Sequence, residues 1–296
     1  MYNIDNSGNP YPYITPKEGA AMKTAGLASA AALCVGAVIF VLCTLQAQAK
    51  GPLQHIQSFA VYYAEPSEQA LAALKKTGLA IIEPQMYTPQ QVAGLQEAGT
   101  LPAAYLSVME SPSWNETRMG RLQPGDYLLQ GGERTHFAAW DSYLMDLRQA
   151  SYRQVLLDEI GAAAEKGFTA VFLDTVGDID EYVQEPALRE EQRRSYVAFL
   201  REVKARFPGV FLIQNRGFDS LTASAPYLQG FLWEDWRGEW RQDEWSAKQV
   251  ELVRRYQRKG LAVFAVSSRS EPKDAREAGR LRFVHLETPS GYDTLK

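Results

Sequence analysis

Cysteine and histidine are scarce in this chain of 296 residues. Its only two cysteines, Cys34 and Cys43, lie inside one apolar segment, so the rest has no thiol for a disulfide, a nucleophile or a thiolate metal site. The three histidines, His55, His136 and His285, are too widely spaced to form a zinc motif. We therefore expect neither a metal nor a cofactor.

Several signature motifs are also missing. The chain has no Gly-x-Gly-x-x-Gly or Gly-x-x-x-x-Gly-Lys phosphate loop and no Gly-x-Ser-x-Gly nucleophile elbow. Its net charge is −4 and no Lys/Arg-rich stripe occurs, which argues against a nucleic-acid partner. The acids at 174, 178 and 180 imitate part of a calcium loop, but the rest of that frame is absent.

One long apolar run, residues 25–45, follows a polar tail at 1–24. Roughly 20 apolar residues suffice for a membrane-spanning helix. Two interpretations stay open. The run is either a single-pass anchor or the apolar part of a secretory signal that is translated from Met22 and cleaved after Ala49. In both cases residues 46–57 form a linker, and the domain beyond it faces outward, tethered to the cell membrane or secreted.

From residue 58 to 296, strand-like and helix-like segments alternate. The expected strands are Ser58–Tyr63, Leu79–Glu83, Leu101–Val108, Ala170–Asp174, Val210–Asn215, Gly230–Glu234, Leu261–Val266 and Leu281–Leu286. The expected helices are Glu68–Lys76, Gln90–Ala98, Ser151–Lys166, Pro186–Phe207, Ser246–Lys259 and Pro272–Gly279. This pattern predicts one α/β domain, a (β/α)8 TIM barrel; a doubly wound sheet is the rival. Residues 110–140 form an irregular stretch that we interpret as a lid or binding loop.

Polar side chains follow most of these strands, where barrels build their active sites. They are Tyr63, Glu65, Glu83, Ser107, Glu110, Asp174, Asn215, Arg216, Glu234, Ser267 and Ser268. Asp174 and Glu234 would lie at the same end of the barrel, and acid/base cleavage of a glycosidic bond requires at least two such carboxylates.

The neighbours of the two acids indicate their roles. Trp233 and Trp236 would give Glu234 an apolar setting that keeps a general acid protonated. Donors beside Asp174, among them Asn215, would keep it anionic as nucleophile or stabilising group. The reverse assignment stays open, and strand spacing fits retaining and inverting enzymes alike.

Aromatic and acidic residues cluster in the same loops. The tryptophans, whose faces suit a pyranose ring, are Trp114, Trp140, Trp233, Trp236, Trp240 and Trp245. The acids are Asp178, Asp180, Glu181, Asp235, Glu239, Asp243 and Glu244. If these acids line a cleft, they favour an amino sugar with a free ammonium.

Four segments resemble the endo-α-1,4-polygalactosaminidases (glycoside hydrolase family 114) and the related Pel-type hydrolase domain: Tyr105–Glu110, Phe168–Thr175, Asn215–Phe218 and Phe231–Glu234. The similarity spans about residues 61–234. It implies an extracytoplasmic barrel that cleaves galactosaminogalactan-like polymers without a cofactor. It also implies that Asp174 and Glu234 are catalytic and that Tyr63, Glu110 and Asn215 contact substrate.

The chain departs from the family pattern in three places. Glu83 stands where Asp is preferred, Met109 replaces a usual Gly, and Phe264–Ser268 lacks an acidic and aromatic tip. These departures concern the substrate more than the catalytic pair. We expect a hydrolase of an α-linked amino-sugar polysaccharide, with a non-hydrolytic cell-surface polysaccharide-binding module as the alternative. The expected substrate-binding residues are Tyr63, Glu83, Tyr105, Glu110, Asn215, Arg216, Trp233 and Trp236.

Overall fold

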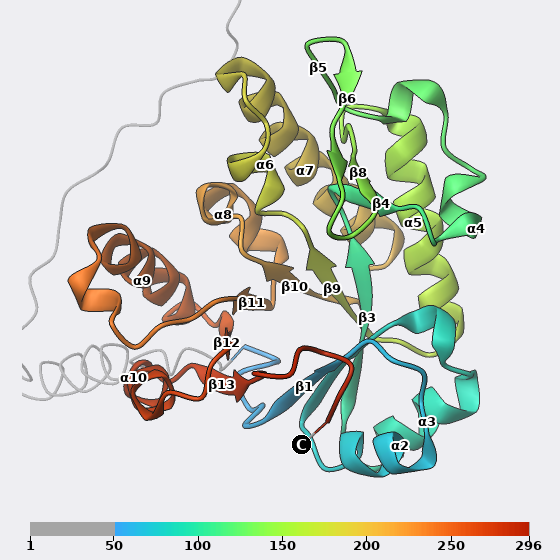
Figure 1. Cartoon of the computed structure of the whole chain (residues 1–296). Coiled ribbons are helices and arrows are strands. Elements are labelled where there is room, and N and C mark those ends of the chain that lie inside the picture. Colours follow the sequence, from blue (N-terminus) through green and yellow to red (C-terminus); the bar gives the residue numbers. More distant parts are fainter. Residues whose placement is uncertain (1–50, 296) are drawn as a thin grey trace, which may run out of the picture. The chain divides into compact units, whose positions relative to one another are not determined.

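The computed structural model describes residues 51–295, and its main element is an eight-stranded parallel sheet (Figure 1). The strands follow one another around the sheet in chain order: β1 (Phe59–Tyr62), β2 (Leu79–Ile82), β3 (Leu101–Ser107), β9 (Ala170–Asp174), β10 (Phe211–Asn215), β11 (Gly230–Trp233), β12 (Ala262–Ser267) and β13 (Val284–Glu287). The sheet curls into a nearly closed barrel. No β13–β1 ladder occurs within residues 51–295, but just after β1 the Tyr63 N–H donates to the Tyr292 carbonyl at 3.0 Å. The predicted α/β barrel is confirmed.

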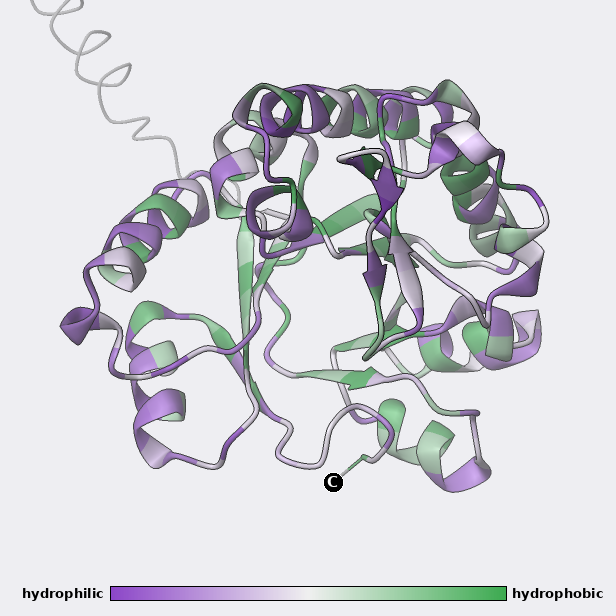
Figure 2. Cartoon of the chain, turned by 45° about the horizontal axis from the view of Figure 1, so that its top comes forward, coloured by the Kyte–Doolittle hydropathy of each residue, from purple (hydrophilic) through white to green (hydrophobic). Residues whose placement is uncertain are grey.

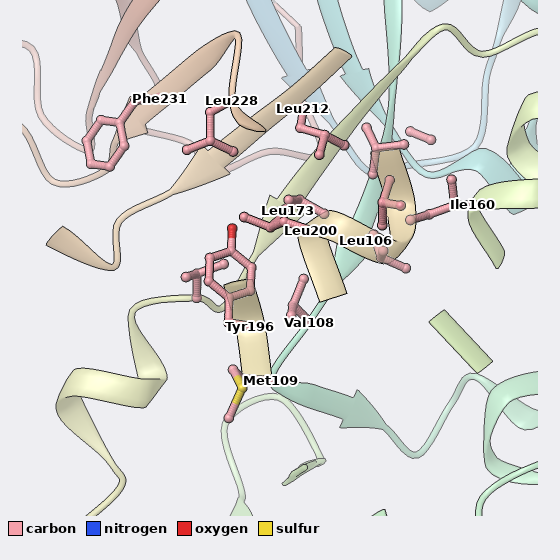
Figure 3. Packing of buried hydrophobic residues seen from close by; sticks show 14 of the residues in the cluster. Leu106, Val108, Met109, Ile160, Leu173, Tyr196, Leu200, Leu212, Leu228 and Phe231 are labelled. Carbon is pink, nitrogen blue, oxygen red and sulfur yellow. The ribbon is translucent and has the colours of Figure 1, made fainter. Parts of the chain in front are cut away.

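Side chains of the barrel strands alternate between two hydrophobic layers, because successive strand residues point to opposite faces. The inner layer fills the barrel and includes Phe172 and Leu232. The outer layer lies between the barrel and the helices and includes Leu106 and Leu200 (Figure 3). Figure 2 shows the apolar strands in the middle and hydrophilic residues on the outer faces of the helices. A strand that ends in an inward polar residue therefore delivers it to the barrel mouth.

The helices cover the outside of the barrel, and several of them begin at a residue whose side chain caps the first turn. They are α2 (Glu68–Leu74), α3 (Pro89–Glu97), α4 (Glu116–Met119), α5 (Ala150–Glu165), α6 (Asp178–Glu181), α7 (Pro186–Arg206), α8 (Phe218–Ser224), α9 (Glu244–Gln257) and α10 (Pro272–Leu281). Thr88 and Gln91 form a capping box at α3, and the Asp243 carboxylate accepts from the Ser246 N–H at α9. Short 3-10 turns are η1 (Pro84–Met86), η2 (Pro124–Asp126), η3 (Ala225–Tyr227) and η4 (Trp240–Gln242).

The stretch after β3 has regular structure, so the expectation of an irregular loop there is wrong. β4 (Glu110–Pro112), β8 (Ser142–Leu144) and β7 (His136–Phe137) form a small antiparallel sheet, and β5 (Leu129–Gln130) pairs with β6 (Glu133–Arg134). These strands have two or three residues each, too short for an alternating pattern to be visible in the sequence. In Figure 1 this insertion (green) lies beyond the tip of β3.

Other predicted elements differ from the structure in detail. The last helix continues to Leu281, since Ala278 and Leu281 are buried and Arg282 adopts the left-handed cap conformation (φ 59°). The eighth strand therefore begins at Val284. The short helices α6 and α8 were not expected. The apolar run at 25–45 lies outside the described residues, and within 51–295 no helix is long and apolar enough to span a bilayer.

Candidate active site

A cavity of about 860 Å³ opens at the C-terminal ends of the barrel strands. This volume is within the usual range of ligand-binding clefts, about 300–1,000 Å³. Eight of the ten residues expected from the sequence line it: Tyr63, Glu83, Tyr105, Glu110, Asp174, Asn215, Arg216 and Glu234. The barrel thus brings together side chains from six of its strands and the loops that follow them.

Asp174 and Glu234 are held by the same amide. The Asn215 Nδ2 donates to Asp174 Oδ1 at 2.7 Å and to Glu234 Oε2 at 2.9 Å. Since both oxygens bind one nitrogen, they are at most 5.6 Å apart, the sum of these two distances. The arrangement fixes the orientation of both carboxyl groups toward the cavity.

Each of the two carboxylates also accepts a hydrogen bond from a tyrosine hydroxyl. The Tyr105 hydroxyl donates to Asp174 Oδ2 at 2.8 Å, and the Tyr292 hydroxyl donates to Glu234 Oε1 at 2.5 Å. Both tyrosine rings pack edge-on against Tyr63, with centroids 4.8 Å and 5.3 Å away. Burial and the nearby carboxylates raise the pKa of all three phenols, and the Tyr105 and Tyr292 hydroxyls act as hydrogen-bond donors.

The pKa of the Glu234 carboxyl is raised above its ordinary value. Burial is the main cause of its raised pKa, and the neighbouring Asp174 charge adds to it. The hydrogen bonds from Tyr292 and Asn215 act in the opposite direction and lower the pKa. Because the upward causes prevail, Glu234 has the properties of a general acid.

The backbone is strained at the residues that directly follow Asp174, Asn215 and Glu234. These residues are Thr175, Arg216 and Asp235, and their φ angles are 61°, 52° and 57°. Non-glycine residues rarely adopt positive φ, and a β-branched Thr is an outlier there.

Hydrogen bonds stabilise the turn at Thr175. Its hydroxyl accepts the N–H groups of Val108 at 3.1 Å and Met109 at 2.8 Å. Met109, the departure from the family pattern, is itself fully buried. The turn that aims Asp174 into the cavity is thus tied to the end of the third strand.

A second pair of acids lies on the cavity wall. Glu110, on β4, accepts a hydrogen bond from the Ser142 hydroxyl. Asp178, which begins α6, has a buried Oδ2 with no hydrogen-bond partner among the described residues. Burial, followed by the proximity of Glu110, strongly raises the pKa of Asp178, so we expect a neutral Asp178 beside Glu110.

The cavity lining carries an excess of negative charge. Seven acidic side chains line it: Glu83, Glu110, Asp174, Asp178, Glu181, Glu234 and Asp235. Arg216 is its one lysine or arginine, and it is paired with Glu181. Such a lining attracts cationic ligands. Within the described residues, no group of three or more His, Cys, Asp or Glu is arranged to hold a metal ion.

Trp233 and Trp236 lie in the core and not in the cavity, contrary to expectation. They are 4% and 1% exposed, and the Trp236 indole N–H donates to the Asp274 carbonyl at 3.0 Å. Strand alternation explains the difference for Trp233, because a residue next to the inward Glu234 must point outward. Neither indole supplies the apolar surroundings of Glu234.

Two other tryptophans do line the cavity. Trp114 and Trp140 belong to the insertion and are 56% and 73% exposed. Trp245 is also half exposed, but it packs on Phe218 outside the cavity. The first two are therefore the tryptophans available to a ligand.

Tyr292 is the functional residue that sequence reasoning missed. It lies in the C-terminal segment beyond the last strand and 58 residues from Glu234, so neither strand position nor spacing marks it. Asp178 was noted only as one acid of a cluster, and its burial is not visible in the sequence.

Comparisons with known proteins agree with this geometry. The model of glycoside-hydrolase family GH114 matches residues 44–284. The glycoside hydrolase domain of PelA from Pseudomonas aeruginosa is 26% identical, with a TM-score of 0.65 over 81% of this chain and 97% of that domain.

Two further structures show the same fold at lower identity. Aspergillus fumigatus Ega3, solved with galactosamine, is 14% identical, with a TM-score of 0.60 over 78% of this chain and 91% of that one. A Thermus thermophilus α-galactosidase is 13% identical, with a TM-score of 0.52 over 80% of this chain and 59% of that one. No curated protein sequence matches. Because the family model covers most of the sequence and the barrel carries the expected acids at its mouth, the chain belongs to glycoside-hydrolase family GH114.

Proposed function

We propose that this protein hydrolyses an α-linked amino-sugar polysaccharide of the galactosaminogalactan or polygalactosamine type. The observation that carries the proposal is the pair Asp174 and Glu234, held by one Asn215 amide inside a cleft of polysaccharide-binding size. Family membership supports the reaction class, glycoside hydrolysis.

The two acids take different roles in this mechanism. Glu234, with its raised pKa, donates a proton to the glycosidic oxygen as the bond to the leaving sugar breaks. The Asp174 carboxylate, held by Tyr105 and Asn215, attacks the anomeric carbon and forms a glycosyl-enzyme. Glu234 then takes a proton from water, which attacks the same carbon and releases the sugar together with free Asp174.

The oxygen separation supports the covalent route. Carboxyl groups are about 5–5.5 Å apart in retaining enzymes and about 6.5–9.5 Å apart in inverting ones. The two oxygens that bind Asn215 are at most 5.6 Å apart, a spacing compatible with the retaining range.

Charge and aromatic surface support the substrate class. An acid-rich cleft favours a polymer with protonated amino groups, since each ammonium finds carboxylates nearby. Trp114 and Trp140 offer exposed indole faces at the same cleft, and such faces stack on the apolar side of a pyranose ring. We propose that they bind sugar units on either side of the cleavage point.

The site of action is proposed to be outside the cytoplasm. The support is the apolar run at residues 25–45, interpreted as an anchor or a cleavable signal. Immunodetection of the mature N-terminus in membrane and secreted fractions would distinguish the two.

Hydrolysis is tested with the full-length protein and partially deacetylated α-1,4-linked galactosamine polymer, by assay of new reducing ends. Asp174→Asn and Glu234→Gln should each lower the rate by about 10²–10⁴-fold. Glu251→Gln, an exposed acid of α9, is the matched control and should retain the rate. Activity that survives both active-site changes contradicts the mechanism. Polymer binding without product formation by the unmodified protein favours the alternative, a non-hydrolytic binding module.

A further inference from the structure

A second, smaller cavity lies beside the cleft, between the outer face of β3 and helix α5. Its volume is about 250 Å³. Most of its lining is apolar: Ala104 and Leu106 of β3, Val171 of β9, and Ile160, Ala162 and Ala163 of α5. Leu106 and Ile160 belong to the packing layer shown in Figure 3. We call this space the side cavity.

The side cavity adjoins the cleft where the barrel wall ends early. The β2–β3 ladder stops at the Ile82–Ala104 pair, whereas β3 continues to Ser107. Beyond Ile82 the chain turns away through η1, which leaves this edge of β3 without a neighbouring strand. Five residues line both spaces: Glu83, Tyr105, Ser107, Pro112 and Trp114. The two spaces therefore adjoin at this unpaired edge of β3.

Glu83 stands at this junction with its bonding capacity unused. It is 7% exposed, and its carboxyl makes no hydrogen bond to any described residue. Burial raises its pKa to about 7. The nearby Arg118 is fully engaged, because it donates to Glu159 and to the carbonyls of Ser107 and Glu110. The Glu83 oxygens are not enclosed by protein but face the cavity space, so Glu83 is free to accept a hydrogen bond from a ligand.

We propose that the side cavity receives the acetamido group of an N-acetylated hexosamine unit, with its N–H donating to Glu83. This inference rests on the proposed function and deepens it. The volume is below the range of about 300–1,000 Å³ for whole ligands, which suits a substituent. The methyl group then packs on Leu106 and Ile160, and Asn115, buried on the same wall, is placed to donate its amide to the acetyl oxygen.

An ammonium group is the poorer occupant of this space. Apolar walls penalise a charge, the lining carries Arg118 and Lys166, and its acid Glu159 is already paired with Arg118. The carboxylates of the main cleft are the better partners for free amines. The place of cleavage would thus depend on the acetylation pattern of the polymer, because one sugar-binding position in the cleft selects the acetylated unit.

A substitution that fills the side cavity tests this proposal. Ala162 is exposed on α5 and lines the cavity, so Ala162→Phe places a ring there with little effect on the core. Ala164→Phe, on the same helix but on neither cavity wall, is the control. The full-length proteins are given randomly N-acetylated α-1,4-galactosamine polymer, and the products are sequenced by mass spectrometry. Melting temperatures establish that both variants fold.

We expect the unmodified protein to place acetylated units at one fixed position relative to the cut. Ala162→Phe should lower cleavage at those sites at least tenfold relative to cleavage of fully deacetylated polymer, and Ala164→Phe should leave this ratio unchanged. Exclusion of acetylated units from every position near the cut overturns the inference, as does an unaltered ratio in Ala162→Phe.

Binding separates the failure of this inference from the failure of the proposed function. If neither polymer is cleaved, the hydrolase proposal fails. Calorimetric titration with an N-acetylated galactosamine trimer and with its deacetylated counterpart then decides the side cavity. The side-cavity proposal is supported if Ala162→Phe loses affinity for the acetylated trimer alone. It is overturned if the variant and the unmodified protein bind the acetylated trimer with equal affinity.

Discussion

Asp174 and Glu234 share a single hydrogen-bond donor, the Asn215 side-chain nitrogen, at 2.7 Å and 2.9 Å. One amide thus sets the separation of the two acids and binds the charge of the one that is ionised. Each acid also has its own tyrosine, so removing one tyrosine changes one acid while the bridge remains. This arrangement makes the assignment of roles open to experiment.

The pH dependence of hydrolysis should follow Glu234. A general acid must be protonated, and its pKa is raised, so kcat/KM should fall as the pH rises through that value. Tyr292→Phe removes a donor that lowers this pKa, which should move the basic limb of the profile to higher pH. Tyr63→Phe is the control for the position of the limb, since Tyr63 packs on Tyr292 but donates to neither acid. A limb that stays in place in Tyr292→Phe argues against Glu234 as the acid.

Hydrolysis should proceed with retention of anomeric configuration. The bridged oxygens are at most 5.6 Å apart, which is compatible with the carboxyl spacing of retaining enzymes, and the Asn215 nitrogen lies between them. Proton NMR of the first products from an α-linked oligosaccharide should show the α anomer before mutarotation. Initial appearance of the β anomer would establish inversion and remove Asp174 from the nucleophile role.

Trp114 and Trp140 should contribute to the binding of long substrates. Alanine at either position removes a stacking face worth about 1–2 kcal/mol, which should raise KM for polymer by about 5–30-fold. Trp245→Ala is the matched control, because that indole is similarly exposed but lies outside the cleft. Equal effects in all three variants would mean that the losses come from folding and not from binding.

Asp178→Asn should stabilise the fold at neutral pH. The pKa of the Asp178 carboxyl is higher in the folded protein than its ordinary value of 3.8, so its contribution to the stability of the fold is fully present below pH 3.8. This contribution is lost as the pH rises toward and through the folded-state pKa. The neutral amide avoids that loss, so we expect a gain of about 1–3 kcal/mol in unfolding free energy at pH 8 and none at pH 3. Thermal denaturation across this range measures it. Asp235→Asn, an exposed acid of the same cleft, should change the melting temperature little.

Arg118 should matter far more for stability than Arg121. Both pair with acids of α5, but the Arg118 side chain is 3% exposed and also binds two carbonyls, whereas that of Arg121 is 39% exposed. Arg118→Met leaves Glu159 and both carbonyls without their donor and should cost about 3–5 kcal/mol, against about 0–1 kcal/mol for Arg121→Met. Chemical denaturation of the two variants provides the comparison, and similar losses would contradict it.

The strand pattern and the strand-end acids are visible in the sequence because they obey local rules. Four or five apolar residues that end in a polar one, as in Phe172-Leu173-Asp174, predict a buried parallel strand whose tip reaches the mouth. The same alternation, applied to Trp233, would have placed that indole outside the barrel. The alternation along this strand therefore separates the inward Glu234 from the outward Trp233.

By itself the sequence determined the alternation of strands and helices and the two acids at the barrel mouth, because these depend on neighbours a few residues apart. Only the tertiary structure decided that Asn215 bridges both acids, that Tyr292 reaches Glu234 from the C-terminal segment, and that Glu83 lies between two cavities with no hydrogen bond to residues 51–295. Such relationships depend on how strands distant in sequence meet around the barrel. Hydrogen bonds and burial act over a few ångströms of space, whatever the number of residues between the partners.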